Sequence, residues 1–265
     1  MTAIAVTIAG SDSGGGAGIQ ADLKTFSALG VYGASVIAAL TAQNTLGVQG
    51  IFDVPPAFVT AQIDSVFADL RVGAVKIGML SRPETIAAVA AGLDRWQAQN
   101  VVLDPVMVAT SGDRLITPDA IAALTRLLMP RALVATPNLH EAAALLDAAV
   151  ARDEAEMRAQ GEAILKLGPR AVLIKGGHFA GPEAVDLLIQ PGRVDRLASP
   201  RLDTPNTHGT GCTLSSALAA GLAKGLALEP ATAAAKDYVA KAIAASVRLK
   251  VGEGRGPTHH FHAWW

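Results

Sequence analysis

The chain has 265 residues, of which 51% are hydrophobic, and its 22 Lys and Arg residues nearly balance its 23 Asp and Glu residues. This length and composition suit one α/β domain with a substantial core, so we expect a single domain over residues 1–265. The formal net charge of −1, without any run of like charges, argues against binding to nucleic acid or to an anionic membrane surface.

The cysteine content and the first residues indicate a cytoplasmic protein. Cys212 is the single cysteine, so no intrachain disulfide can form, as is usual in a reducing compartment. Residues 1–6 lack the basic start of a signal peptide and run directly into strand-like sequence. Residues 25–52 carry no charge, but Gln43, Asn44 and several glycines interrupt them, so we interpret them as buried strand and loop rather than as a membrane span.

Short apolar runs alternate with helical patterns from one end of the chain to the other. The clearest helix begins near Pro55 and Pro56, where apolar residues recur at helical spacing. The other predictions in this part of the chain are strands at residues 5–8, 34–37, 74–77, 101–103, 133–135 and 172–174, and helices at 83–97, 118–128, 140–149 and 153–167. This alternation predicts a mainly parallel sheet with helices on both faces.

The C-terminal part adds two further patterns. Residues 185–189 and 194–197 flank Pro191-Gly192 and predict an antiparallel hairpin. Two helices follow, over residues 211–224 and 231–250. The predicted fold class is therefore a three-layer α/β/α sandwich with a central, mainly parallel sheet and an antiparallel hairpin near its C-terminal part.

Residues 206–216 are the most informative stretch of the sequence. Gly209 and Gly211 allow successive main-chain N–H groups to converge on one anion, and the helix that follows adds the positive end of its dipole. The same field predicts that the Cys212 thiol ionises more readily than a free thiol. A glycine loop that caps a buried helix, with Cys212 as a small core residue, explains the local pattern equally well.

Polar residues follow several predicted strands, at the edge of a parallel sheet where ligands gather. These residues are Asp12, Gln43, Asn44, Asp104, Asn138 and Lys175. The first of these loops, residues 10–18, is rich in glycine, but Ile19 stands where a dinucleotide fingerprint needs a third glycine, and a P-loop ending is absent. Its glycines therefore indicate either close approach to a small ligand or a mobile turn before a helix.

Each remaining candidate has a structural alternative. Asn138 and Glu141 fit a helix capping box, and they also fit a pair that holds hydrated Mg²⁺. Lys175 could neutralise phosphate oxygens or simply be solvated, and Asp104 could lie near a metal or simply end a strand. Gln43 offers the donor and acceptor that match an aminopyrimidine edge, or it satisfies loop backbone.

The histidines at the C-terminus do not form a convincing metal motif. Residues 259, 260 and 262 are histidines, but no carboxylate or cysteine lies near them in the sequence. We interpret this segment as packing or tail.

Seven ordered sequence blocks, taken together, closely resemble the hydroxymethylpyrimidine/phosphomethylpyrimidine kinases of thiamine biosynthesis, in the ribokinase-like superfamily. The blocks are residues 10–22, 40–45, 76–80, 104–107, 136–141, 175–178 and 206–216, and the ending at 256–262 is similar as well. This resemblance implies ATP with Mg²⁺ as phosphoryl donor and commonly a homodimer. Sugar kinases of the superfamily have an aspartate at the position of Cys212, which argues against a sugar substrate.

The resemblance also implies roles for individual residues. The main chain of Gly209, Thr210 and Gly211 would bind the transferring phosphoryl group, while Cys212 would take the proton of the attacking hydroxymethyl group. The other implied assignments are Lys175 and His208 at the nucleotide, Lys236 at the adenine pocket, Asn138, Glu141 and Asp104 at Mg²⁺, and Gln43, Ala17, Met79, Val106, Gly10 and Asp12 at the pyrimidine.

The implied activity is two successive phosphorylations at one site, first of the pyrimidine alcohol and then of its monophosphate. A pyridoxal kinase of the same superfamily is the nearest alternative. A non-catalytic ligand-binding module is more remote, because the residues of the phosphate site and the metal pair are all present, and a dinucleotide oxidoreductase lacks its fingerprint.

Overall fold

A mixed sheet forms the centre of the protein. The computed structural model describes residues 1–107, 116–177, 179 and 181–265. Its strands are β1 (Ile4–Gly10), β2 (Tyr32–Asn44), β3 (Gly47–Asp53), β4 (Ala74–Ile77), β5 (Val101–Leu103), β6 (Val134–Ala135), β7 (Ala171–Lys175), β8 (Glu183–Gln190) and β9 (Arg193–Pro200). Within the described ranges they form one nine-stranded sheet in the order β3-β2-β1-β4-β5-β6-β7-β8-β9.

The six central strands are parallel, in the order β2, β1, β4, β5, β6 and β7, whereas β3, β8 and β9 pair antiparallel with their neighbours. The predicted mainly parallel sheet and the hairpin of β8 and β9 are confirmed. Strand β3 was not predicted, because residues 25–52 were interpreted as buried strand and loop. Its side chains are mostly exposed since it lies at the edge of the sheet, so it shows no buried alternating pattern.

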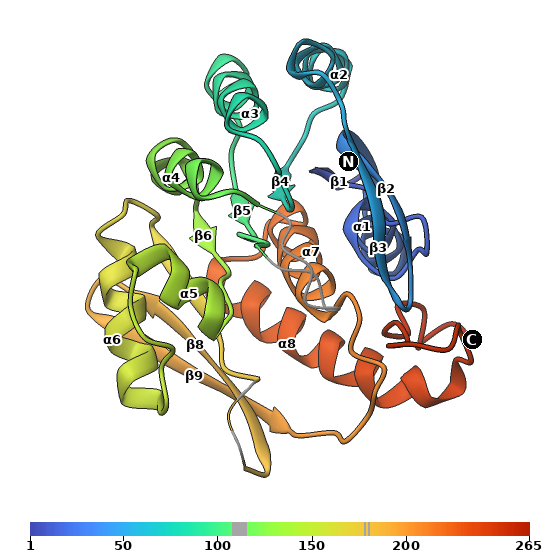
Figure 1. The fold of residues 1–265 in the computed structure, drawn as a ribbon, viewed down its shortest axis with the longest axis vertical. Helices are drawn as coiled ribbons and strands as arrows, with labels where there is room; N and C mark the ends of the chain where they lie inside the picture. The colour runs from blue at the N-terminus through green and yellow to red at the C-terminus, as the bar shows by residue number, and fades with distance from the viewer. Residues whose placement is uncertain (108–115, 178, 180) are drawn as a thin grey trace.

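Helices cover both faces of the sheet (Figure 1). On one face lie α2 (Pro56–Asp69), α3 (Pro83–Arg95), α4 (Pro118–Leu127), α5 (Leu139–Leu146) and α6 (Glu154–Leu165). On the other face lie α1 (Gly18–Ala28), α7 (Thr210–Ala223) and α8 (Leu228–Ala245). Short 3₁₀ turns at Met129–Arg131 and Ser246–Arg248 follow α4 and α8. The predicted three-layer α/β/α sandwich is therefore confirmed.

The predicted ends of α3, α4, α6 and α7 lie one or two residues beyond the observed ones, and those of α5 and α8 lie further beyond. Helix α5 ends at Leu146 instead of residue 149, because Asp147 adopts a left-handed conformation with φ of 49°. Helix α8 ends at Ala245, and a 3₁₀ turn occupies the residues that follow. None of the helices in the described part of the chain has the length and apolar character that crossing a bilayer requires.

The alternation of side chains along the strands positions the polar groups of the site. In β4, Val75 and Ile77 pack among the core residues under α2, α3 and α4, so Lys76 points to the opposite face, where α1 and α7 pack. The same alternation turns Asp104, after β5, and Lys175, at the end of β7, toward that face. Three charged side chains thus converge beneath the start of α7.

Candidate active site

The first turn of α7 lies at the carboxyl ends of the parallel strands. Its N-cap, Gly209, has φ of 77°, and a Cβ atom there would collide with the carbonyl oxygen of Gly16. A Cβ atom on Gly211 would lie 3.2 Å from Lys175 Nζ and 3.8 Å from Asp104 Oδ2. Both glycines therefore allow the close approach of other groups. We call residues 209–212 the anion-binding turn, because its helix N-terminus and the neighbouring lysine both favour a negatively charged ligand.

Cys212, in this turn, is only partly buried. The pKa of its thiol is nevertheless raised to about 11, mainly by burial and also by Asp22 and Asp104, although Lys76 and the main-chain N–H of Gly18 act in the opposite direction. The sequence-based prediction of a readily ionised thiol is therefore wrong for the resting protein. The physical reason is that the cost of burying a thiolate exceeds the favourable field of the helix N-terminus.

Lys175 joins two carboxylates beside the anion-binding turn. Its Nζ lies 2.9 Å from Asp104 Oδ1 and 3.8 Å from Glu141 Oε2. Asp104 also accepts hydrogen bonds from Thr136 Oγ1 at 3.2 Å and from Ser215 Oγ at 3.1 Å. Burial opposes the charge of Asp104, but Lys175 and Lys76 outweigh that effect and hold its pKa below the usual value. The carboxylates in turn raise the pKa of Lys175, which is therefore a cation.

Asn138 and Glu141 form the predicted capping box at the start of α5. Glu141 N donates to Asn138 Oδ1 at 2.9 Å, and Asn138 N donates to Glu141 Oε2 at 2.7 Å. Burial raises the pKa of Glu141 to about 7, against the effect of Lys175. Among the described residues, no group of three or more His, Cys, Asp or Glu side chains is arranged to hold a metal ion by itself.

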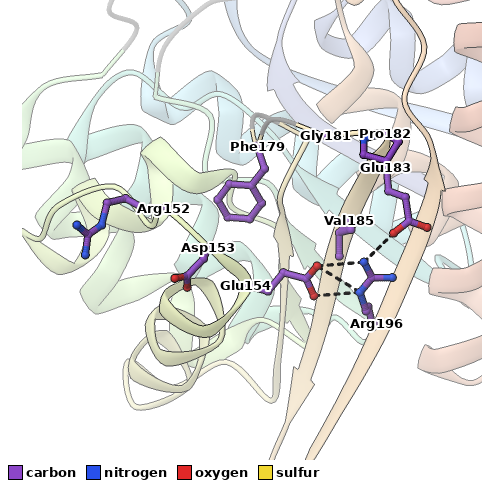
Figure 2. Close-up of a pocket in the computed structure, with 9 residues that line it drawn as sticks. All are labelled: Arg152, Asp153, Glu154, Phe179, Gly181, Pro182, Glu183, Val185 and Arg196. Atoms are coloured by element: carbon purple, nitrogen blue, oxygen red, sulfur yellow. Dashed lines mark hydrogen bonds and ion pairs between the residues drawn. The ribbon is translucent and has the colours of Figure 1, made fainter.

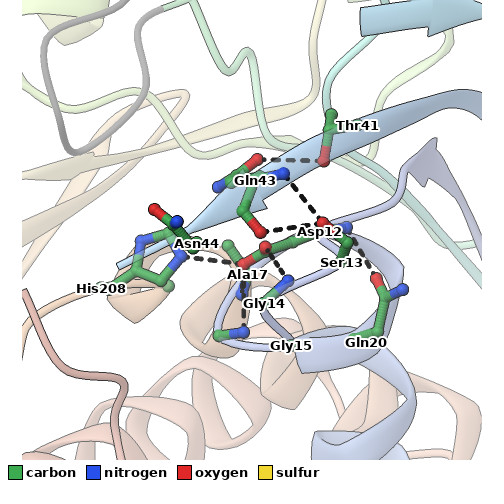
Figure 3. A network of polar contacts seen from close by, with 12 residues as sticks. Asp12, Ser13, Gly14, Gly15, Ala17, Gln20, Thr41, Gln43, Asn44 and His208 are labelled. Carbon is green, nitrogen blue, oxygen red and sulfur yellow. Dashed lines mark hydrogen bonds and ion pairs between the residues drawn. The ribbon is translucent and has the colours of Figure 1, made fainter. Parts of the chain in front are cut away.

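Asp12 organises the first glycine-rich loop. Its carboxylate accepts hydrogen bonds from the main-chain N–H groups of Gly14 at 2.8 Å, Gly16 at 3.0 Å and Ala17 at 2.8 Å, as Figure 3 shows in part. His208 Nε2 lies 2.8 Å from the same carboxylate. Burial opposes the charge, yet these hydrogen bonds hold the pKa of Asp12 below its usual value. The chain itself thus engages Asp12, the predicted pyrimidine ligand, and His208, the predicted nucleotide ligand.

Gln43 lies at a bulge of β2, next to this loop. Its Oε1 accepts a hydrogen bond from Thr41 Oγ1 at 3.2 Å, and Ser13 Oγ bonds to both main-chain groups of Gln43 at 2.8 Å (Figure 3). A Cβ atom on Gly14 would lie 3.2 Å from the Gln43 carbonyl oxygen. The loop therefore packs against Gln43 on one side and against Gly209 on the other.

The remaining predicted pocket residues border this loop. Gly10 N donates to Met79 O at 3.2 Å, and the Met79 methyl group occupies the space that a side chain on Gly10 would need. Ala17 is the N-cap of α1 and contacts the anion-binding turn. Val106, two residues after Asp104, is half-buried. All residues of the 104–107 block are described by the structure. His178, the last residue of the 175–178 block, lies outside the described residues.

Lys236 is anchored by a buried carboxylate. Its Nζ lies 2.8 Å from Asp186 Oδ2, and Asp186 Oδ1 accepts a hydrogen bond from Gly176 N at 3.1 Å. Burial raises the pKa of Asp186. This contact places Lys236 next to the loop that follows Lys175, although its charge is already paired.

Sequence reasoning gave no role to Lys76 or Asp22. Both side chains are fully buried, with Lys76 Nζ 2.8 Å from Asp22 Oδ2. The available signal was a lysine inside an otherwise apolar strand, Ala74-Val75-Lys76-Ile77. A charged side chain at such a position is rarely buried unless an oppositely charged partner lies beside it, because burying an unpaired charge is costly.

Two other features lie apart from the anion-binding turn. A cavity of about 330 Å³ lies near the start of α6. Arg196, which lines it, pairs there with Glu154 and Glu183 (Figure 2). At the C-terminus, His260 Nε2 lies 3.1 Å from Thr213 Oγ1, and the His260 carbonyl accepts a hydrogen bond from Tyr238 at 2.6 Å. Arg196 in the cavity is therefore already paired with two acidic residues, and the histidine segment packs against α7 and α8.

The mainly parallel α/β/α sandwich, with the start of α7 and Lys175 close together at the strand ends, has the fold of the ribokinase-like small-molecule kinases. The model of the phosphomethylpyrimidine kinase family matches residues 12–259. The chain is 63% identical to a hydroxymethylpyrimidine/phosphomethylpyrimidine kinase of Rhizobium meliloti (100% of this chain, 99% of that one) and 54% identical to that of Escherichia coli (98% of each). The chain belongs to the phosphomethylpyrimidine kinase family.

The structural comparison agrees on the fold. An ADP complex of Bacillus subtilis pyridoxal kinase has a TM-score of 0.92, with 37% sequence identity and 99% of each chain covered. This identity of 37% is lower than the 63% and 54% found for the two hydroxymethylpyrimidine/phosphomethylpyrimidine kinases, so the pyridoxal kinase alternative is not favoured. The sequence-based prediction of a kinase from this family is confirmed.

Proposed function

We propose that the chain phosphorylates 4-amino-5-hydroxymethyl-2-methylpyrimidine with ATP and then phosphorylates the resulting monophosphate to the diphosphate, for thiamine biosynthesis. The observation that carries this proposal is the anion-binding turn with Lys175 beside Gly211. Phosphoryl transfer depends mainly on positioning and charge stabilisation, so one turn can serve an alcohol acceptor and a phosphate acceptor. The names of the close relatives support the same two substrates.

In the first transfer, the main-chain N–H groups of Gly209, Thr210 and Gly211 would stabilise the negative charge on the transferring phosphoryl group. Lys175 would neutralise the nucleotide phosphates from the end of β7. Cys212 would act as the base for the hydroxymethyl group, and this role requires its thiolate form. The second transfer needs no base, because a phosphate oxygen is already ionised.

The oxygen-rich pair on α5 fits a magnesium ion that keeps most of its waters. Asn138, Glu141 and Asp104 offer hard oxygen atoms beside Lys175, and Mg²⁺ usually combines one or two carboxylates with waters and phosphates. The ion would supply charge neutralisation between the nucleotide phosphates. Within the described residues, no cluster of three acidic, histidine or cysteine side chains could hold a metal by itself, which fits an ion bound partly through waters and phosphates.

The pyrimidine would lie between the first loop and the end of β4. Gln43 would bind the aminopyrimidine edge through its side-chain amide, while Ala17, Met79 and Val106 would pack on the ring and Gly10 would leave space for it. Asp12 would act by holding the loop in shape. His208 and Lys236 would support the nucleotide side, where each lies next to a loop of the phosphate site.

We also propose that residues 1–265 act as one domain in the cytoplasm.

We further propose that two copies of the chain associate through strand β3, at the edge of the sheet. Leu40 and Phe52 are paired in register and are 46% and 67% exposed, with Leu46, Ile51 and Phe58 also exposed nearby in the sequence. An exposed apolar edge strand is a liability unless another chain covers it. Phe52→Lys should therefore convert a dimer to a monomer in sedimentation equilibrium. Leu202→Lys, at an exposed residue that follows β9 at the other edge of the sheet, is the control and should remain a dimer. A monomeric unmodified protein would reject the dimer.

The activity is tested by incubating the protein with ATP and Mg²⁺ and either the pyrimidine alcohol or pyridoxal. We expect the pyrimidine monophosphate first and the diphosphate later, resolved by anion-exchange chromatography. Cys212→Ala should slow the first transfer much more than the second. Equal losses of rate in both transfers for Cys212→Ala would show that Cys212 is not the base. Phosphorylation of pyridoxal but not of the pyrimidine alcohol by the unmodified protein would reject the proposed substrate.

A further inference from the structure

A buried ion pair lies beneath the anion-binding turn. Lys76, on β4, and Asp22, on α1, are both 0% exposed. Apolar side chains of similar size often stabilise a fold at least as well as such a pair, because removing two charges from water is costly. Fold stability alone therefore does not explain why this chain keeps a lysine and an aspartate here.

The hydrogen bonds of Asp22 hold the pair in one arrangement. Asp22 Oδ2 accepts from Thr7 Oγ1 at 2.6 Å and from Lys76 Nζ at 2.8 Å, and Oδ1 accepts from Ser216 Oγ at 2.6 Å. Within the described parts of the chain, Asp22 is the one side chain that accepts a hydrogen bond from Lys76. Both oxygens of the carboxylate thus accept hydrogen bonds, whereas the ammonium keeps spare N–H donors.

The contact between α1 and α7 places this pair one helical turn below the Cys212 sulfur. The main-chain N–H of Gly18 bonds to the Cys212 sulfur, and Asp22, four residues later, bonds to Ser216, four residues after Cys212. Residues four apart lie above one another on one face of a helix. The absence of a side chain on Gly78 makes room for the ammonium, since a Cβ atom there would lie 2.7 Å from Lys76 Nζ.

Four charged groups act on the Cys212 thiol from the elements packed around it. Asp22 on α1 and Asp104 after β5 disfavour a thiolate, whereas Lys76 on β4 and Lys175 on β7 favour one. Lys76 is the largest of the influences that oppose burial. Without this lysine, burial and two carboxylates would act together against ionisation of the sulfur.

We propose that Lys76, held in place by Asp22, is a positioning residue that compensates the thiolate charge of Cys212 in the first phosphoryl transfer. In that step the thiolate takes the hydroxyl proton and becomes a thiol, while the hydroxyl oxygen bonds to the γ-phosphorus of ATP. The bond from that phosphorus to the bridging oxygen breaks, and ADP leaves with the electron pair. The inference rests on the proposed base role of Cys212. The second transfer, onto a phosphate oxygen, does not need Lys76.

The test compares Lys76→Met and Asp22→Asn in the full chain. One readout is the rate at which iodoacetamide alkylates Cys212 at pH 8 in the absence of substrates, and the other is kcat for the alcohol and for the monophosphate. Lys76→Met should slow alkylation and kcat for the alcohol at least about tenfold, with kcat for the monophosphate within about twofold. Asp22→Asn should accelerate alkylation, because it removes a negative charge and keeps the ammonium. Lys241→Met, at an exposed lysine on α8, is the matched control.

An unchanged alkylation rate in folded Lys76→Met would overturn the inference, as would equal losses of kcat for both acceptors. Where Lys76→Met does not fold, the double variant Lys76→Met/Asp22→Asn replaces it, since both charges are then removed. The double variant should be alkylated more slowly than Asp22→Asn alone, and an equal rate would also overturn the inference. Because alkylation is measured without substrate, failure of the base role and failure of the Lys76 effect give different results.

Discussion

His208 Nε2 lies 2.8 Å from Asp12 Oδ2, and this contact ties the first glycine-rich loop to the residues just before α7. Residues 196 positions apart in the sequence are thereby joined at the edge of the sheet. The same carboxylate holds the N–H groups of Gly14, Gly16 and Ala17. One buried acid therefore sets the relative position of the loop proposed for the pyrimidine and the turn proposed for phosphate.

Asp12→Asn should destabilise the protein and impair both transfers. An amide has one acceptor oxygen, so at least one main-chain N–H loses a charged partner, at a cost of about 2–3 kcal/mol in the free energy of unfolding. The pKa of Asp12 is lowered in the folded state, so its stabilising effect is present above the unfolded value of 3.8 and is lost as the pH falls below it. Urea unfolding at pH 7 and pH 3 measures both effects. Asp203→Asn, at an exposed acid, is the control, and equal stability of the two variants at pH 7 would contradict the assignment.

Glu141→Gln should change the pH dependence of stability in the opposite sense. The pKa of Glu141 rises from 4.5 to about 7 on folding, so the protonated side chain favours the folded state below pH 4.5 and this contribution is lost as the pH rises toward 7. Glutamine cannot ionise, so the variant should gain stability relative to the unmodified protein between pH 4.5 and pH 7, by up to about 1.4 kcal/mol per pH unit, and the difference should level off above pH 7. Urea unfolding across this range measures it, with the exposed Glu162→Gln as control. A difference in the free energy of unfolding that stays constant with pH would argue against a raised pKa of Glu141.

Much of the framework was predictable because it depends on local periodicity. The apolar runs of β1, β4, β5 and β7 are buried on both sides, and such runs stand out in a sequence. Strand β3 was missed since an edge strand with exposed side chains has no such pattern. The capping box of Asn138 and Glu141 was recognised from its spacing alone, because both partners lie within one helical turn.

The site was less predictable where it depends on contacts between distant segments. Asp12 follows a strand as ligand-binding residues do, yet its partners are the loop itself and His208, which no local pattern relates to it. Lys76 and Asp22 lie 54 residues apart, so only the fold reveals their ion pair. The prediction for Cys212 used the helix N-terminus and omitted the burial of its surroundings, and burial has the larger effect.

The resting thiol should accordingly be slow to react. A thiol with a pKa of about 11 holds about 100-fold less thiolate at pH 8 than one with the ordinary value of 9.0. Alkylation by iodoacetamide at pH 8 should be slower by about that factor in the folded protein than in concentrated urea, and the rate should keep rising up to pH 11. Mass spectrometry of the single cysteine follows the reaction. An alkylation rate that levels off at pH 8 would instead support the sequence-based prediction that the Cys212 thiol ionises readily.

Gly209→Ala should remove activity because alanine fits neither the conformation nor the space at this position. The left-handed conformation, with φ of 77°, costs alanine about 1–2 kcal/mol, and its Cβ atom would also meet the Gly16 carbonyl oxygen. Gly192→Ala is the matched control, since Gly192 has φ of 74° but nothing within 4 Å of the added atom. Both variants should lose stability, whereas only Gly209→Ala should move the anion-binding turn and lower kcat, by about 100-fold. Steady-state kinetics with urea unfolding separate the two effects. Equal kcat values in the two variants would show that the turn does not need its close contact with the first loop.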